Sequence, residues 1–155
     1  MKTTTLLLLL RDDEILLAMK KRGFGSGRWN GVGGKIEGDE TIEQALIREC
    51  QEEIGVTPVE YQPVAVHDFQ FPDGTSDMQV HTYLCQKWEG EPVESEEMAP
   101  RWFKISDIPY DDMWQDDIHW LPLVLEGKCL HTQFTFDENE KLVDTHIHEA
   151  PAQMI

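Results

Sequence analysis

The chain has 155 residues, and its 13 basic and 30 acidic residues give a formal net charge of −17. This length fits one domain, and 40% apolar with 28% charged residues is typical of a globular chain. So acidic a protein lacks the basic surface that polynucleotides and anionic membranes require. A small anion bound through a divalent cation remains compatible with this charge. We therefore expect one domain over residues 1–155, with no polynucleotide or membrane partner.

The cysteines and the N-terminal residues bear on the compartment. The three cysteines form no Cys-x-x-Cys pair, which favours a reducing environment over a disulfide or zinc framework. The apolar run Leu6–Leu10 has five residues and ends at Arg11, which is too short for a signal peptide. No stretch approaches the ~20 apolar residues of a membrane span. A cytoplasmic protein is expected.

The first third of the chain predicts a hairpin followed by a glycine-rich segment. Thr3–Leu10 and Ile15–Met19 are apolar runs typical of buried strands, and the polar residues Arg11–Glu14 between them indicate a turn. Seven glycines then fall within Gly23–Gly38. Such a density is typical of backbone that adopts unusual dihedral angles or lies close to a ligand.

A helix is expected at residues 41–53. Thr41, followed three residues later by Gln44, has the form of a capping box. Gly55 follows as a C-terminal stop. The segment therefore has a start signal and an end signal at the spacing of a helix of ordinary length.

The rest of the chain predicts further strands and one more helix. Pro72-Asp73-Gly74 has the composition of a turn between two strands. Pro122 weakens the prediction of the second helix, because proline disrupts helix interiors. Together the elements indicate an α+β fold in which helices cover a mixed sheet. The expected strands are Tyr61–Phe71, Met78–Trp88, Arg101–Ile105, Leu130–Phe136 and Leu142–Ile147, and the expected helix is Asp116–Leu125.

The first helix carries glutamates on its apolar stripe. At about 100° per residue from Ile42, the stripe runs from about 300° to about 120°, and Glu49 and Glu53 fall inside it at about 340° and 20°. Glu52 lies beside the stripe at about 280°. Glutamate is rarely buried unpaired, and two like charges about 4 Å apart repel by about 4 kcal/mol at an effective dielectric of 20. A solvated acidic face is one explanation. A hard cation such as Mg²⁺ or Mn²⁺, which prefers carboxylate oxygens, is the other.

Residues 34–56 also carry a spaced motif. Gly34, Glu40 and the run Arg48–Val56 match the Nudix box, G-x5-E-x7-R-E-U-x-E-E-x-G-U with U aliphatic, at every charged and glycine position. Cys50 departs from an aliphatic position, a mild change because free cysteine packs as a small hydrophobe. The chain thus resembles the Nudix hydrolase family. The resemblance implies one Nudix domain over 1–155, an α/β/α sandwich whose mixed sheet lies between the box helix and a C-terminal helix.

The resemblance extends beyond the box to the MutT-like branch of the family. Residues 20–25, 27–31, 92–95, 97–98, 112–114 and 116–117 are similar to that branch in regions where Nudix enzymes choose substrates. The branch hydrolyses oxidised purine nucleoside triphosphates, such as 8-oxo-dGTP and 2-oxo-dATP, to the monophosphate and pyrophosphate. The resemblance therefore implies an Mg²⁺-dependent diphosphohydrolase that sanitises the nucleotide pool, acting as a monomer.

The resemblance also implies a catalytic metal site. Arg48 would orient the glutamates by a salt bridge, and Glu40 would order the loop. Glu53 would both bind the metal and activate water. The implied Mg²⁺ ligands, with Mn²⁺ as a substitute, are the Gly33 carbonyl, Glu49, Glu52, Glu53 and Glu97.

The implied nucleotide site draws on several elements. A carboxyl group neutralised by burial can donate to a base oxygen, and an ionised one accepts from ring N–H groups, so Asp116 and Asp117 could together bind both oxidised guanine and oxidised adenine. Core packing of Phe69 and Trp114, and an acidic pair at a helix N-terminus, are the purely structural alternatives. The relatives carry proline at Gln115 and phenylalanine at Val32. The implied substrate-binding residues are Thr5, Lys20, Phe24, Asn30, Val32, Gly33, Gly34, Lys35, Phe69, Met78, Trp114, Gln115, Asp116 and Asp117.

Two other functions remain open at this point. Pro72 lies near the position where ADP-ribose hydrolases of the family carry a proline, so another nucleotide, such as ADP-ribose or a dinucleoside polyphosphate, is one alternative. A catalytically silent nucleotide-binding module is the other, although such a module would be expected to lose a box glutamate. No catalytic role is expected for the histidines, which are His67, His81, His119, His131, His146 and His148.

Overall fold

The structure is a computed structural model that describes residues 1–155, except the side chain of Met154. Its strands are β1 (Lys2–Arg11), β2 (Glu14–Lys20), β3 (Trp29–Asn30), β4 (Thr57–Gln70), β5 (Met78–Glu89), β6 (Met98–Lys104), β7 (Leu130–Phe136) and β8 (Leu142–Glu149). The helices are α1 (Ile42–Ile54) and α2 (Asp117–Leu125). Short 3-10 turns lie at Ile105–Asp107, Tyr110–Asp112 and Ala152–Met154.

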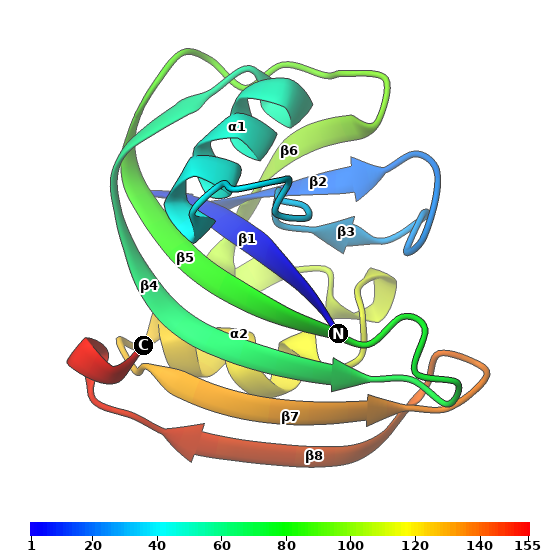
Figure 1. Cartoon of the computed structure of the whole chain (residues 1–155). Coiled ribbons are helices and arrows are strands. Elements are labelled where there is room, and N and C mark those ends of the chain that lie inside the picture. Colours follow the sequence, from blue (N-terminus) through cyan, green and yellow to red (C-terminus); the bar gives the residue numbers. More distant parts are fainter.

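The strands form one mixed, strongly twisted sheet in the order β3-β2-β1-β5-β4-β7-β8, and β6 pairs with the other side of β2 (Figure 1). β1 runs parallel to β5 and β4 runs parallel to β7, whereas the other ladders are antiparallel. Figure 1 shows α1 in front of β1 and β5, and α2 behind β4 and β7. This arrangement is the expected α/β/α sandwich.

The leucines of β1 explain the two-sided core. Leu7 and Leu9 pack on the face that α1 covers, together with Leu46 of that helix. Leu8, which points to the opposite face, packs with Trp120 of α2. Successive side chains of a strand alternate between faces, so a strand covered on both faces is apolar throughout. The unbroken leucine run therefore reflects a central position in the sandwich.

The start and end of α1 are as predicted. Thr41 accepts a hydrogen bond from the backbone N–H of Gln44, and the Gln44 side chain accepts one from the backbone N–H of Thr41. Gly55 ends the helix with a φ of 71°, in the left-handed region that glycine enters without strain. Local chemistry alone thus fixes both ends of the element that carries the box glutamates.

Several elements differ from the expectation. β4 begins at Thr57 rather than Tyr61, because register shifts next to Pro58 and Pro63 let the strand continue where a regular ladder would stop. β3 is too short for any periodicity to reveal it. β6 begins at Met98, earlier than the expected start, and α2 continues through Pro122 at the loss of one backbone hydrogen bond. Within the described residues, no helix combines the length and apolar character needed to cross a membrane.

Candidate active site

The glycine-rich segment lies directly against β1. The backbone N–H of Thr5 donates to the Gly34 carbonyl at 2.9 Å, and an isolated bridge joins Thr4 to Lys35. A Cβ on Gly33 would overlap the Thr5 carbonyl, and one on Gly34 would lie 2.5 Å from the Glu49 carboxyl carbon. The glycines are therefore required for close approach, to the first strand on one side and to α1 on the other.

Glu53 is the most buried of the box glutamates. Its side chain is 5% exposed and accepts a hydrogen bond of 2.7 Å from the backbone N–H of Gly33. Burial raises the pKa of Glu53 to about 8, against the opposing effect of that hydrogen bond, and the nearby charges of Glu49 and Glu97 raise it further. The helix thus places a glutamate where burial and neighbouring acidic groups disfavour its charged form.

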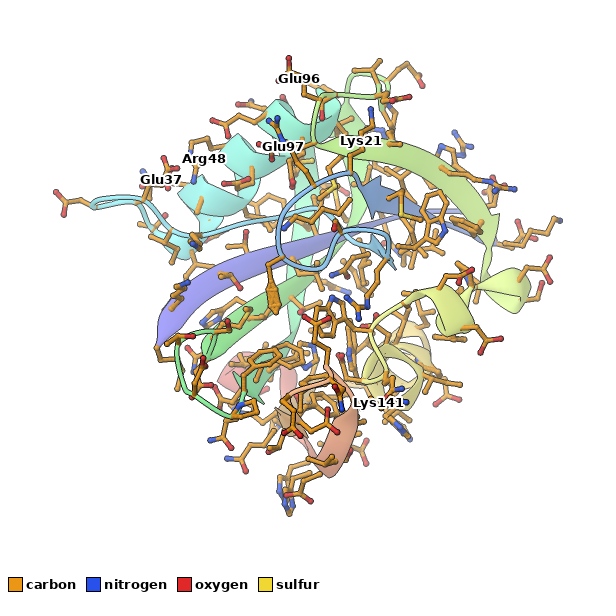
Figure 2. The ribbon with its side chains drawn as sticks, turned by 90° about the vertical axis from the view of Figure 1, so that its right-hand side faces the viewer. Lys21, Glu37, Arg48, Glu96, Glu97 and Lys141 are labelled. Carbon is orange, nitrogen blue, oxygen red and sulfur yellow. The ribbon has the colours of Figure 1, made fainter. Side chains whose placement is uncertain are left out.

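Arg48 organises the acidic groups around the exposed end of this site. Its guanidinium donates to Glu40 at 2.7 Å, to Glu49 at 2.9 Å and to Glu52 at 3.2 Å. Glu37 lies 3.8 Å from it on the preceding loop (Figure 2). Hydrogen bonds to Glu40 and Glu49 raise the pKa of Arg48, although burial opposes them. One guanidinium therefore faces four carboxylates, and negative charge remains in excess.

Glu97 approaches the site from the loop before β6. Its backbone carbonyl accepts from the N–H of Lys21, and its carboxylate lies 3.6 Å from the Arg22 guanidinium. Figure 2 shows Glu97 beside Lys21, on the side of α1 that carries the glycine-rich loop. The charge of Glu97 is close enough to raise the pKa of Glu53, so both carboxyl groups belong to the same acidic cluster.

These groups fit a hard divalent cation in chemistry, although not in a closed shell. Among the described residues, no three Asp, Glu, His or Cys side chains converge as a metal-binding group. Glu49 and Glu52 instead bond to Arg48, and Glu53 bonds to Gly33. The available donors are carboxylate oxygens, and their negative charge is in excess. Among them, burial raises the pKa of Glu53. Oxygen donors of this kind are those that Mg²⁺ and Mn²⁺ prefer.

A cavity of about 350 Å³ opens between the glycine-rich loop, the ends of β1, β4 and β5, and the start of α2. That volume is in the range of small-molecule sites. Most substrate-binding residues implied by the sequence line it, namely Thr5, Lys20, Phe24, Asn30, Gly33, Gly34, Lys35, Phe69, Met78, Trp114, Asp116 and Asp117.

Two of the implied residues lie elsewhere. Val32 is 3% exposed and packs in the core beneath α1, so its side chain does not line the cavity. Gln115 accepts a hydrogen bond of 2.8 Å from the backbone N–H of Leu142 and thereby holds the β7–β8 hairpin. The departures at these two positions therefore act on the core and the hairpin, outside the cavity lining.

The cavity walls are aromatic. Phe24 meets Trp114 edge to face at a centroid distance of 5.2 Å, and Trp114 meets Phe136 at 5.4 Å. Phe69 stacks with Phe134 at 5.7 Å on the inner side. Flat apolar walls of this kind suit a planar heterocycle, which gains dispersion and stacking energy between rings.

The inner end of the cavity holds two adjacent carboxyl groups. Asp116 and Asp117 are 2% and 3% exposed, and the indole N–H of Trp120 donates to Asp116 at 2.8 Å. Burial raises the pKa of both carboxyls, and the neighbouring Asp116 charge raises that of Asp117 further. Among the described residues, the Asp117 Oδ2 atom has no hydrogen-bond partner. Burial and the closeness of the two carboxyls therefore disfavour two negative charges in the pair.

His67 is a cavity residue that the sequence analysis did not single out. It is fully buried on β4, its Nδ1 atom lies 2.6 Å from the Thr132 hydroxyl, and its ring centroid lies 4.3 Å from that of Trp120. Strand alternation could have marked it as inward-facing, since Ala65 and Phe69 share its face. His67 was predicted to have no catalytic role, and this stays a prediction.

His67 makes stability sensitive to acid. Burial, assisted by the neighbouring His81, lowers the pKa of His67 from 6.5 to about 3. The unfolded chain therefore binds a proton below pH 6.5 that the folded chain does not, and stability falls as the pH falls from 6.5 towards 3. We expect the free energy of unfolding of His67→Leu, taken relative to that of the wild type, to rise by about 2 kcal/mol when the pH falls from 7 to 5. The estimate uses about 1.4 kcal/mol per pH unit.

Urea unfolding of both proteins at pH 7 and pH 5 measures this difference. His119→Leu, on the exposed side of α2, is the matched control and is expected to follow the wild type. If the difference in unfolding free energy between His67→Leu and the wild type is the same at pH 7 and at pH 5, burial does not keep the imidazole neutral.

Comparison with known proteins agrees with the fold and the motif. The NUDIX domain model matches residues 1–124, and the chain therefore belongs to the Nudix family of hydrolases. The oxidized purine nucleoside triphosphate hydrolase of Danio rerio is 45% identical over 148 residues, covering 96% of this chain and 95% of that protein. Its counterpart from Mus musculus is 41% identical over 145 residues, covering 94% and 93%. A MutT protein from Bacillus halodurans has the same fold, with a TM-score of 0.86 and 25% identity over 97% of this chain and 100% of that one.

Proposed function

We propose that this Nudix hydrolase converts oxidised purine nucleoside triphosphates, such as 8-oxo-dGTP and 2-oxo-dATP, to the monophosphate and pyrophosphate. The observation that carries the proposal is the pair of buried carboxyls, Asp116 and Asp117, at the inner end of an aromatic cavity. The box glutamates lie beyond the other end of the cavity, where Gly33 both lines it and bonds to Glu53. Two relatives that match nearly the whole chain bear the name of this activity.

The base would be read by the acidic pair and by Asn30. A neutral Asp117 donates to a base oxygen, and an ionised Asp116 accepts from a ring N–H or an amino group. Exchange of the single proton between the two carboxyls lets the same cavity receive oxidised guanine and oxidised adenine. Phe24, Phe69, Met78 and Trp114 would hold the ring plane.

Nudix hydrolases are generally dependent on divalent metals, and the donor set of this chain suits Mg²⁺, with Mn²⁺ as a substitute. The residues that would hold the ion are the Gly33 carbonyl, Glu49, Glu52, Glu53 and Glu97. When bound, the ion polarises the phosphoryl group and neutralises the pyrophosphate leaving group.

The residues of the chain supply the remaining steps. Glu53, which is buried next to Gly33 at the metal side of the cavity, accepts the proton of the attacking water. Arg48 holds Glu49 and Glu52 in orientation through its hydrogen bonds. Lys20, which lines the cavity and faces Glu53, provides positive charge towards the triphosphate.

The products of a nucleotide panel test this proposal. With Mg²⁺, 8-oxo-dGTP and 2-oxo-dATP are expected to yield the monophosphate and pyrophosphate, and ADP-ribose and dinucleoside polyphosphates are expected to turn over far more slowly. Orthophosphate release would contradict the reaction. Preferred turnover of ADP-ribose would assign a different nucleotide, and binding without turnover would indicate a silent module.

We further propose that one domain over 1–155 acts as a cytoplasmic monomer.

A further inference from the structure

We propose that Arg28 is a positioning residue that fixes the Trp114 wall of the cavity and joins it to the tip of the β7–β8 hairpin. The inference deepens the proposed function, because its kinetic consequence depends on the base that the cavity receives. It assigns a binding role to the hairpin tip, which lies far from the box in the sequence.

The contacts of Arg28 define a bridge of three side chains. Its guanidinium carbon lies 4.1 Å from the centroid of the Trp114 ring, within the range of a cation–π contact. The Nη2 atom of the same guanidinium donates to the Glu140 carboxylate at 3.0 Å. The side chains of Arg28 and Glu140 are 28% and 43% exposed, so both charges are partly withdrawn from water. Arg28 therefore holds the indole on one side and the hairpin on the other.

The hairpin tip is firm enough to serve as an anchor. The Asp137 carboxylate accepts hydrogen bonds from the backbone N–H groups of Asn139 and Lys141 at 2.8 and 3.0 Å. Leu142 then donates to Gln115, the residue directly after Trp114, at 2.8 Å. Figure 2 labels Lys141 at this tip. Trp114 is thus tied to the hairpin twice, through Arg28 and through Gln115.

Gly25, Phe24 and Phe136 also pack against Trp114. A Cβ on Gly25 would lie 3.2 Å from the indole nitrogen, so the loop passes close to the ring because residue 25 is glycine. Phe24 and Phe136 meet the ring edge to face. Removal of Arg28 would take away the guanidinium that packs over the indole ring. The expected consequence is weaker capture of the base with little effect on the chemical step.

The chain contains a matched control for this bridge. Arg11 lies 4.0 Å from the centroid of Trp102 and 3.3 Å from the Glu14 carboxylate, which repeats the arrangement of arginine, indole and glutamate. Neither Arg11 nor Trp102 lines the cavity, whereas Arg28 and Trp114 both do. Loss of Arg11 therefore removes a similar contact without altering a cavity wall.

Steady-state kinetics with 8-oxo-dGTP and Mg²⁺ test the role in binding. Arg28→Ala is expected to raise KM about fivefold to tenfold, the effect of losing one partly buried cation–π contact, and to change kcat less than about twofold. Arg28→Lys keeps the charge but not the planar stack, and it is expected to recover part of the loss. Arg11→Ala is expected to leave KM unchanged. A KM of wild-type size in Arg28→Ala, or an equal rise in Arg11→Ala, would overturn the inference.

A measurement without nucleotide separates this inference from the proposed function. Acrylamide quenching of each protein, minus that of the same protein with Trp114→Phe, isolates the signal of Trp114. Arg28→Ala is expected to make Trp114 more accessible to acrylamide, and Glu140→Gln is expected to do so to a smaller extent. Unchanged quenching would refute the positioning role even if oxidised purines are hydrolysed. Increased quenching in a protein that does not hydrolyse them would support the role of Arg28 and reject the proposed function.

Discussion

Glu53→Gln is expected to lower kcat for 8-oxo-dGTP by at least ~100-fold while the protein keeps its fold. The glutamine oxygen can still accept the hydrogen bond of 2.7 Å from Gly33, so the glycine-rich segment stays in place. The substitution removes the negative charge that would bind the cation and the base that would accept the proton of water. A neutral amide of the same size also suits this buried position, so thermal stability is not expected to fall.

Glu43→Gln is the matched control, because Glu43 lies on the same helix, in its exposed first turn. It is expected to leave kcat unchanged. The measurement is kcat at saturating nucleotide and Mg²⁺, together with the melting temperature of each variant. Turnover by Glu53→Gln close to that of the wild type would remove Glu53 from the mechanism.

Asp117→Asn is expected to lower kcat/KM for 8-oxo-dGTP by about ten- to a hundredfold, because one unmatched buried hydrogen-bonding group costs about 1–3 kcal/mol. Burial and the adjacent Asp116 charge raise the pKa of Asp117, which favours its neutral form. An amide cannot pass that proton to its neighbour. The cavity is thereby restricted to one protonation pattern, and 8-oxo-dGTP and 2-oxo-dATP are expected to lose activity unequally.

Asp116→Asn provides the comparison, because it also changes the acceptor of the Trp120 N–H. The apparent Mg²⁺ affinity is expected to stay close to that of the wild type in both variants, since the acidic pair and the box glutamates occupy separate regions. If both variants keep the order and size of the wild-type preferences, the acidic pair does not read the base.

Local sequence signals predicted the elements whose ends or surroundings are encoded nearby. The capping box at Thr41 and the glycine at position 55 predicted α1, and the leucines of β1 predicted a buried strand, which the structure shows packed on both faces. The place of Glu53 on the apolar stripe left a solvated acidic face open as one explanation, and the structure shows this side chain buried. In each of these cases the deciding interactions lie within one or two turns of the chain, or within one strand.

Contacts between distant segments were beyond such signals. Arg28 and Glu140 are separated by 112 positions, and His67 and Thr132 by 65, so nothing in their local sequence reveals that they meet. β3 has only two residues, and only its pairing with β2 across the intervening loop defines it as a strand. Gln115 was assigned to the nucleotide site by resemblance, whereas its side chain is held by the backbone of Leu142. The box and the base cavity were therefore foreseen more fully than the bridge that braces the cavity wall.

The buried acidic pair is proposed to select oxidised purines over unmodified ones. The ratio of kcat/KM for 8-oxo-dGTP to kcat/KM for dGTP, measured for the wild type at neutral pH with Mg²⁺, tests this selection. We expect a ratio of at least about ten, which corresponds to one additional hydrogen bond to the oxidised base. A ratio of one or below would contradict the oxidised-purine assignment and leave the Nudix chemistry with a different nucleotide.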